Sequence, residues 1–159
     1  MGAIERFREA AEAAGLDVEV VRFPEGTKTA ADAARAVGCE IGQIVKSLVF
    51  MADGRPLVAL TSGANRADTD RLAVLAGAAE VRRAAPEEAR AATGFAIGGT
   101  PPFGYPGPVS QFMDRTLLGH AEVWAAAGTP DGVWRVDPAR LLEVTGARVE
   151  DFGVAAPSG

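Results

Sequence analysis

Hydrophobic residues lie on both faces of the segment 44–51 when its positions are read with a period of two. Strands of this kind are usually central in a sheet and covered on both sides. Lys46 interrupts the pattern, on the face that also carries Leu48 and Phe50. Because a buried, unpaired ammonium group is costly, the pattern predicts that Lys46 faces a carboxylate, a phosphate or a cleft. The alternative is that Lys46 starts the strand and extends to solvent along its aliphatic stem.

A short helix is predicted immediately before this strand. Thr29 is a typical N-cap residue, Asp32 follows three positions later, and Gly38 is suited to end the helix. Further helices are predicted at 4–14, 68–75, 86–94 and 138–146. Strands are predicted at 18–23, 57–61, 80–83, 109–113, 122–126 and 133–136, with turns at 24–26, 53–54 and 131–132 and a frayed tail beyond 152. The interleaving of helices with two hairpins favours an α+β fold with a mixed sheet, in one domain spanning residues 1–159.

The segment 98–108 consists almost entirely of glycine and proline, and it also contains two aromatic residues. Prolines restrict the conformations of a loop, while glycines allow backbone N–H groups to approach a ligand closely. Its length exceeds what a simple turn needs, so a ligand-binding loop is one interpretation. A plain connecting loop is the other.

The composition narrows the classes of function. The chain has 159 residues, of which 48% are hydrophobic and 23% charged, as in ordinary globular domains. No apolar run is long enough for a membrane span, and the N-terminus has no signal-peptide pattern. A single cysteine fits a reducing cytoplasm. The net charge of −5 argues against non-specific binding of nucleic acid, although a small basic patch could still recognise one end of a nucleic acid.

The usual catalytic groups are absent from the sequence. His120 is the only histidine and follows a predicted turn, where a lone surface side chain is the commoner outcome. Cys39 follows a helix C-terminus, where the helix dipole disfavours a thiolate. No metal-ligand cluster and no glycine-rich phosphate loop occur. An enzyme with this sequence would work without a metal, a cofactor or a histidine base.

The Thr29 helix is followed by 43–50 (QIVKSLVF), and 98–104 (GGTPPFG) lies further downstream. These two segments, in this order, resemble the YbaK/ProX family, the free-standing relatives of the editing domain of bacterial prolyl-tRNA synthetases. The segments 61–63 (TSG), 65–68 (NRAD) and 114–118 (DRTLL) agree. The resemblance covers roughly residues 18–142. It implies a compact α+β domain with a mixed, partly barrel-like sheet and flanking helices, and hydrolysis of wrongly charged aminoacyl-tRNA.

The resemblance also implies a site. We expect Lys46, Gly98 and Gly99 to be catalytic, with Lys46 at the substrate's anionic group and the glycine loop at the developing oxyanion. The residues expected to bind substrate are Phe23, Thr29, Ser47, Pro102, Phe103, Gly104, Asp114 and Ala126. Ser47 stands where many relatives carry threonine. The segment 126–132 lacks the serine and the basic turn of the cysteine-specific relatives, which weakens Cys-tRNA as the substrate.

The leading hypothesis is therefore a trans-acting deacylase that removes Ala, Ser, Thr or Cys from mischarged tRNA, with tRNA-Pro as the expected carrier and prolyl-tRNA synthetase as a possible partner. A small pocket should be lined by Phe23, Leu48, Phe50 and Ala126. Local contacts with the acceptor end are expected from Lys28, Arg66, Arg71, Arg82 and Arg83. The alternatives are a catalytically silent module that binds aminoacyl-tRNA or a nucleotide, and a subunit that docks on a synthetase.

Overall fold

A computed structural model describes residues 1–23 and 29–156 of the chain. Its largest sheet has five strands in the order β5-β2-β3-β6-β9. β2 pairs antiparallel with β3 and β5, whereas β6 lies parallel to β3 and β9 parallel to β6. These strands span Val45–Ala52 (β2), Arg55–Ser62 (β3), Val81–Arg83 (β5), Ser110–Asp114 (β6) and Arg148–Glu150 (β9). The mixed α+β fold predicted from the sequence is confirmed.

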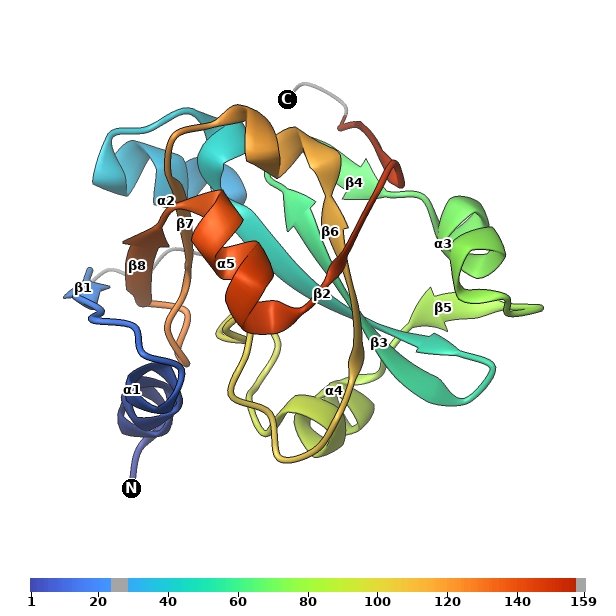
Figure 1. Cartoon of the computed structure of the whole chain (residues 1–159), viewed down its shortest axis with the longest axis horizontal. Helices are drawn as coiled ribbons and strands as arrows, with labels where there is room; N and C mark the ends of the chain where they lie inside the picture. The colour runs from blue at the N-terminus through green and yellow to red at the C-terminus, as the bar shows by residue number, and fades with distance from the viewer. Residues whose placement is uncertain (24–28, 157–159) are drawn as a thin grey trace.

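Two smaller sheets complete the β-structure. A three-stranded sheet has the order β1-β8-β7, and β4 forms a two-stranded sheet with β10. Figure 1 shows the three-stranded sheet beside the start of β2, where Ile44 bridges to Trp124. The strands are Val21–Arg22 (β1), Asn65–Ala67 (β4), Val123–Ala126 (β7), Gly132–Val136 (β8) and Gly153–Ala155 (β10).

The helices begin and end close to where their capping residues predict. Thr29 Oγ1 accepts a hydrogen bond from the Asp32 N–H at 3.1 Å, and Gly38 ends the helix in the left-handed region. Asp68 and Asp137 cap two further helices. The helices are Ala3–Ala13 (α1), Ala30–Val37 (α2), Thr69–Ala76 (α3), Pro86–Thr93 (α4) and Pro138–Thr145 (α5), with 3₁₀ turns at Ile41–Gln43 (η1) and Arg115–Gly119 (η2).

Two sequence predictions about the ends of the chain need correction. The strand predicted at 18–23 is reduced to Val21–Arg22, and the turn predicted at 24–26 lies outside the described residues. The tail predicted to fray beyond 152 instead forms β10, whose residues pair with β4 in the register Gly153↔Ala67 to Ala155↔Asn65. This pairing satisfies backbone groups that a frayed tail would leave to water.

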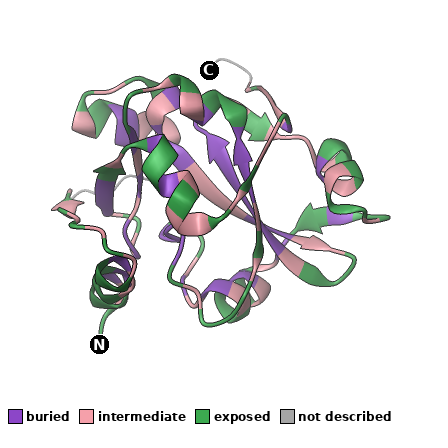
Figure 2. Cartoon of the chain, in the orientation of Figure 1, coloured by how far each residue is buried: buried purple, intermediate pink, exposed green. Residues whose placement is uncertain are grey.

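The strand β2 is covered on both faces, as its pattern predicted. Val45 and Val49 belong to the larger core cluster, which includes Phe7 and Trp134. Phe50, on the opposite face, belongs to a second cluster with Leu72. Figure 2 shows the buried strands in the interior and exposed residues on the outer faces of the helices. Lys46 therefore sits on a strand that separates two hydrophobic clusters.

Candidate functional site

A cavity of about 540 Å³ lies against the N-terminal half of β2. Its walls come from parts of the chain that are distant in sequence: Thr29 and α2 with the turn after it, β2, Arg83 of β5, the segment 97–100, β7, and Pro130 with Val133 of β8. A volume of this size falls within the range of pockets that bind small organic ligands. Of the residues predicted to form the site, Thr29, Lys46, Ser47, Gly98 and Ala126 line this cavity, as does Leu48.

Lys46 contributes the ammonium group of the cavity. The side chain is half-buried, and Nζ donates a hydrogen bond to the backbone oxygen of Asn65. Burial lowers the pKa of Lys46 below its ordinary value, and the nearby Arg83 guanidinium lowers it further, whereas the negative charge of Asp114 acts in the opposite direction. The sequence predicted a carboxylate, a phosphate or a cleft for this lysine, and the structure provides a cleft.

Ser47 offers hydrogen-bonding groups that the described residues do not use. Its Oγ is buried and is the one buried side-chain polar atom of the described chain without a hydrogen-bond partner. The Val49 oxygen accepts from the Ala84 N–H at 3.0 Å, so by the alternation of an antiparallel strand the peptide groups of Ser47 face the same edge. β5 pairs only with residues 50–52 of β2, and within the described residues no strand pairs with this edge at Ser47. A ligand in the cavity could meet both the hydroxyl and the strand edge.

The α2 and β7 walls are largely apolar. The Thr29 hydroxyl caps α2, while Ala30 and Ala33 present only methyl groups to the cavity. Trp124 and Ala126 line it from β7, and Trp124 packs against the same hydrophobic cluster as Ala30. The three alanines leave space in the cavity, and the apolar surface of these walls favours an apolar group over a charged one.

Gly98 and Gly99 have different roles in the loop wall. Gly98 lines the cavity with a backbone φ of +90°, a conformation that favours glycine. Gly99 does not line it, and its N–H donates to the Ala96 oxygen at 3.1 Å. A side chain at Gly99 would place its Cβ 2.8 Å from the Gly128 oxygen and from Thr129 Cα. Gly99 therefore permits close contact between two loops. Of the two glycines, Gly98 is the one whose N–H has no hydrogen-bond partner within the described residues.

The remaining loop residues predicted to bind substrate lie away from the cavity. The Phe103 side chain is 8% exposed and packs against Phe7 and Trp134, with ring centroids 5.4 and 5.7 Å away. The Pro102 oxygen accepts from Gln111 Nε2, and Gly104, with φ +95°, faces Ala10. The apolar ring of Phe103 is more stable in the core than at a wet cavity, so this half of the loop is part of the core.

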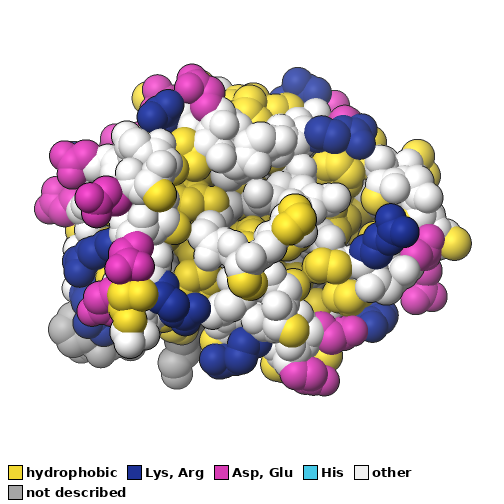
Figure 3. Space-filling model, turned by 60° about the horizontal axis from the view of Figure 1, so that its bottom comes forward, with side chains coloured by type: hydrophobic (Ala, Val, Ile, Leu, Met, Phe, Trp, Pro, Cys, Tyr) yellow, Lys and Arg dark blue, Asp and Glu magenta, His cyan; other side chains and the backbone are white. Residues whose placement is uncertain are grey.

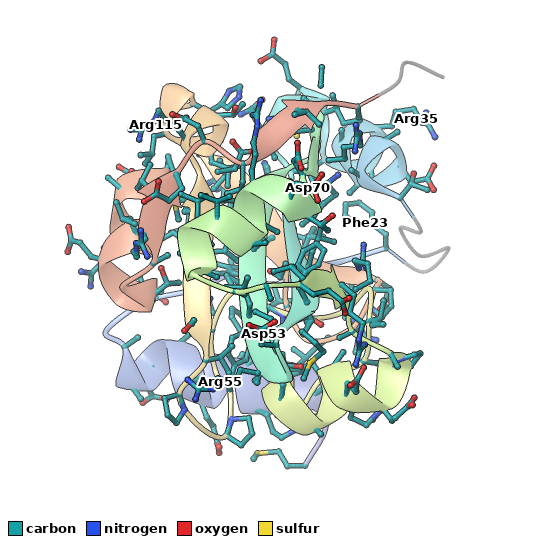
Figure 4. All side chains as sticks on the ribbon, turned by 90° about the vertical axis from the view of Figure 1, so that its right-hand side faces the viewer. Phe23, Arg35, Asp53, Arg55, Asp70 and Arg115 are labelled. Carbon is teal, nitrogen blue, oxygen red and sulfur yellow. The ribbon has the colours of Figure 1, made fainter. Side chains whose placement is uncertain are left out.

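Three other predicted residues also lie outside the cavity lining. Phe23, which is labelled in Figure 4, is half-buried, and its N–H donates to the backbone oxygen of Asp131. Phe50 is 2% exposed in the second hydrophobic cluster, beneath the Arg83 guanidinium. Asp114 is 2% exposed and accepts hydrogen bonds from Ser62, Asn65 and Thr116. The alternation of side chains along β2 correctly placed Leu48 at the cavity. It could not show that Phe50, two residues further along the strand, lies beyond the end of the cavity.

The basic residues predicted to contact tRNA also differ from one another. Arg83 lines the cavity, and within the described residues it forms no ion pair. The neighbouring Arg82 is held by Glu88 through two bonds of 2.8 Å, and this pairing lowers the pKa of Glu88 to about 2. Arg66 is exposed, Arg71 lies 3.7 Å from Asp68, and Lys28 lies outside the described residues. Figure 3 shows that Lys and Arg side chains stand around one face and do not form one broad patch.

Several cavity residues were missed by sequence reasoning. Ile41 and Ile97 line the cavity from opposite segments and are 41% and 44% exposed, which is unusual for large aliphatic side chains. Trp124 was placed in a predicted strand without a role. Because apolar residues of this kind are common in any core, no local signal marked them. Their exposure beside one cavity becomes visible only in the fold.

The potential metal ligands, the helices and the Cys39 thiol of the described residues bear on other classes of function. Residues 1–23 and 29–156 contain no group of three or more potential metal-ligating side chains. None of their helices has the length and apolarity needed to cross a bilayer. Burial raises the pKa of the Cys39 thiol, as do the charges of Glu40 and Glu122, so a reactive thiolate is disfavoured there.

Comparison with known proteins gives consistent matches over most of the chain. The sequence profile of the aminoacyl-tRNA editing domain matches residues 24–144. Proline–tRNA ligase of Nitratidesulfovibrio vulgaris is 34% identical over 96 residues, which are 60% of this chain and 17% of the ligase. The enzyme of Elusimicrobium minutum is 36% identical over 116 residues, 73% of this chain and 19% of the ligase. The chain thus spans less than a fifth of the length of these ligases.

A solved structure matches over nearly the full length. It is described as a candidate trans-editing enzyme for prolyl tRNA synthetase, and it superimposes with a TM-score of 0.92 at 46% identity. The match covers 98% of this chain and 99% of the other. The protein YwhH of Bacillus subtilis is 24% identical over 82% of this chain and 83% of its own length. The fold and the sequence thus point to the same group of proteins.

Proposed function

Because the chain belongs to the aminoacyl-tRNA editing domain family, whose members include relatives of the prolyl-tRNA synthetase editing domain, we propose that it is a trans-acting deacylase. Its substrate would be tRNA wrongly charged with alanine, serine, threonine or cysteine, with tRNA-Pro as the expected carrier. The reaction is hydrolysis of the ester between the amino acid and the terminal ribose. Its place of action would be the cytoplasm, near prolyl-tRNA synthetase.

The observation that carries this proposal is the chemical composition of the cavity. Its described lining contains two cations, Lys46 and Arg83, and no carboxylate, although the whole chain has a net charge of −5. The same lining contains the buried, unpartnered hydroxyl of Ser47 and a largely apolar wall. An aminoacyl-tRNA terminus has matching parts: an anionic phosphate, a polar ester and a short side chain. Cations without ion-pair partners attract such an anionic ligand.

The chemistry needs little from the protein beyond positioning. An aminoacyl ester is already activated, so hydrolysis requires an oriented nucleophile and stabilisation of the oxyanion. The Gly98 N–H is the backbone group we assign to the oxyanion, and Lys46 holds the terminal phosphate or the ester region. Water oriented by the adjacent ribose hydroxyl serves as the nucleophile, or the substrate's own side chain does so. This scheme requires no histidine base, metal or cofactor.

Selection between amino acids would come from exclusion. Leu48 and Ala126 both line the cavity, and we propose that they bound the space for the amino-acid side chain. A hydrophobic pocket discriminates by about 1–3 kcal/mol per methylene, so alanyl and seryl esters should be hydrolysed faster than leucyl or phenylalanyl esters. Contacts with the acceptor end would be few, with Arg83 the first of them, and affinity should therefore fall only gently with salt.

The test is a deacylation assay on a panel of tRNA-Pro species charged with alanine, serine, threonine, cysteine, leucine and proline. We expect rapid hydrolysis of one or more of the small amino acids and slow hydrolysis of the leucyl and prolyl esters. Binding of the charged tRNAs without hydrolysis would instead support a catalytically silent sensor. Faster release of leucine than of alanine would contradict the small pocket.

A further inference from the structure

Asp114 is a buried carboxylate without an ion-pair partner in the described part of the chain. It is 2% exposed, and its oxygens accept hydrogen bonds from the Ser62 N–H at 3.1 Å, the Thr116 N–H at 3.0 Å and Asn65 Nδ2 at 2.9 Å. Burying a charge is costly unless several donors compensate for it. Three well-placed donors therefore compensate for the burial of this carboxylate and fix its position in the fold.

Asn65 connects this carboxylate to the candidate catalytic lysine. The Asn65 side chain donates to Asp114 and, at 3.1 Å, to Thr116 Oγ1, while the Asn65 backbone oxygen accepts from Lys46 Nζ. One residue therefore holds the buried anion on one side and the ammonium on the other. Because the side chain fixes the position of the residue, it also fixes the direction of the carbonyl that Lys46 contacts.

The C-terminal strand encloses this arrangement. A Cβ at Gly153 would lie 2.6 Å from Asp114 Oδ2 and 2.8 Å from Asn65 Nδ2, so glycine is required for β10 to pair with β4 at this point. The hydrogen bond between Asn65 and Asp114 is thereby covered by backbone. Coverage of this kind strengthens the bond and keeps the pair in a single geometry.

We infer that Asp114 and Asn65 act as positioning residues for Lys46, with Asn65 directing the ammonium and Asp114 stabilising its positive charge. The catalytic part of this inference rests on the proposed function, because it takes Lys46 as the group that contacts substrate. The inference also changes the role expected of Asp114. Its carboxylate acts behind Asn65, and it does not contact substrate.

The charges that face Lys46 make this role testable. Arg83 from β5 opposes the protonated lysine, as burial does, and Asp114 from β6 favours it. If the Asp114 charge is removed, burial and Arg83 act without opposition, so the pKa of Lys46 should fall further. A reaction that requires protonated Lys46 would then lose activity at a lower pH than the wild-type protein does.

The experiment uses the fact that the chain has only two lysines, Lys28 and Lys46. In the full chain carrying Lys28→Arg and labelled with ¹³C-lysine, the Lys46 Cε signal can be titrated directly by NMR, without substrate. We expect Asp114→Asn to lower the titration midpoint by about half a unit or more, which is less than the ~1–3 units produced by a directly adjacent opposite charge, because Asp114 lies behind Asn65. A folded Asp114→Asn protein with an unchanged midpoint overturns the inference.

Asp53→Asn is the matched control. The Asp53 carboxylate also accepts two backbone N–H bonds, of 2.9 and 3.0 Å, but it lies at the opposite end of the β2–β3 pair from Lys46. Figure 4 shows Asp53 well separated from Arg115, the residue that follows Asp114. This variant should leave the Lys46 midpoint unchanged. An equal shift in both variants would indicate a general effect of destabilisation and would overturn the proposed role of Asp114.

Asn65→Ala provides a second variant that keeps the backbone carbonyl and the Asp114 charge. We expect kcat for deacylation to fall about tenfold with KM changed less than about twofold, because only the orientation of Lys46 is lost. Wild-type kcat in a folded Asn65→Ala protein overturns the inference even where Asp114→Asn does not fold. The NMR titration does not depend on activity. A wild-type protein that hydrolyses no ester would refute the proposed function, and the titration would still test whether Asp114 stabilises the charge of Lys46.

Discussion

The strand β2 and the loop 98–108 were both expected to form the site, and they occupy it to different extents. Along β2, Lys46, Ser47 and Leu48 all line the cavity. In the loop, Gly98 and Thr100 reach it, while Phe103 packs in the core against Phe7 and Trp134. The strand therefore supplies the polar side chains Lys46 and Ser47, whereas the loop supplies a wall and the N–H of Gly98.

The difference follows from what each kind of pattern constrains. In a strand, period two fixes the face of each side chain once its neighbours are known to be buried. A loop rich in glycine and proline has no such period, so its composition indicates an unusual backbone without indicating which residues face a ligand. A buried aromatic in such a loop is as consistent with core packing as with binding.

The largest expected effect tests whether the second half of the loop is core. Phe103→Ala should lower the free energy of unfolding by about 3 kcal/mol or more, since it removes a buried aromatic side chain. Phe103→Leu, which better conserves volume, should cost less than about 1.5 kcal/mol. Denaturant unfolding measures both. If Phe103→Ala left stability unchanged and abolished deacylation, Phe103 would belong to the site after all.

A smaller effect is expected where the loop meets its neighbour. Gly99→Ala would bring a Cβ to 2.8 Å from the backbone at Gly128 and Thr129, so one of the two loops must move. We expect a loss of stability of about 1–3 kcal/mol and a lower kcat, because Gly98 moves with Gly99. Gly107→Ala is the control in the same loop, since no atom lies within 4 Å of its added Cβ. Equal effects of the two substitutions on unfolding and turnover would show that the contact at Gly99 is unimportant.

The smallest effect separates two adjacent arginines on β5. Arg83→Ala should reduce kcat/KM for alanyl-tRNA about tenfold, the low end of the loss for a hydrogen bond to a charged group. Arg82→Ala should change it less than about twofold, because Arg82 is already paired with Glu88. Steady-state kinetics on both variants measures the difference. Comparable losses in the two would mean that the acceptor end covers a wider surface than the cavity mouth.

Much of the fold was predictable because its signals are local. Caps at Thr29, Asp68 and Asp137 and the left-handed glycines that follow place the helices to within a residue or two. The Asp53-Gly54 turn fixes the β2–β3 hairpin, and both residues have the positive φ that such a turn requires. The strand β10 was missed because its partner, β4, is distant in sequence, and a three-residue edge strand has no period to read.

The site was predictable only in part. Lys46 was identified because a charge on a buried strand needs an explanation. Asp114 was predicted to bind substrate on the strength of the family resemblance, and its burial behind Asn65 leads us to propose a positioning role for it instead. Asn65 carries no such signal, since asparagine is common in turns and its contacts join segments far apart in the chain. The sequence marks where charge is unusual, and the fold determines which groups that charge meets.

The most direct test of the account is single-turnover deacylation of alanyl-tRNA-Pro by the wild-type protein and by Lys46→Ala, with unfolding measured on the same samples. We expect Lys46→Ala to fold normally and to react about 10²–10³-fold more slowly, corresponding to ~2–4 kcal/mol of lost transition-state stabilisation. Lys46→Arg should restore only part of the rate, because a planar guanidinium cannot replace a compact ammonium in this cavity. A stable Lys46→Ala protein that reacts at nearly the wild-type rate would contradict the central claim that Lys46 acts in this cavity on the substrate.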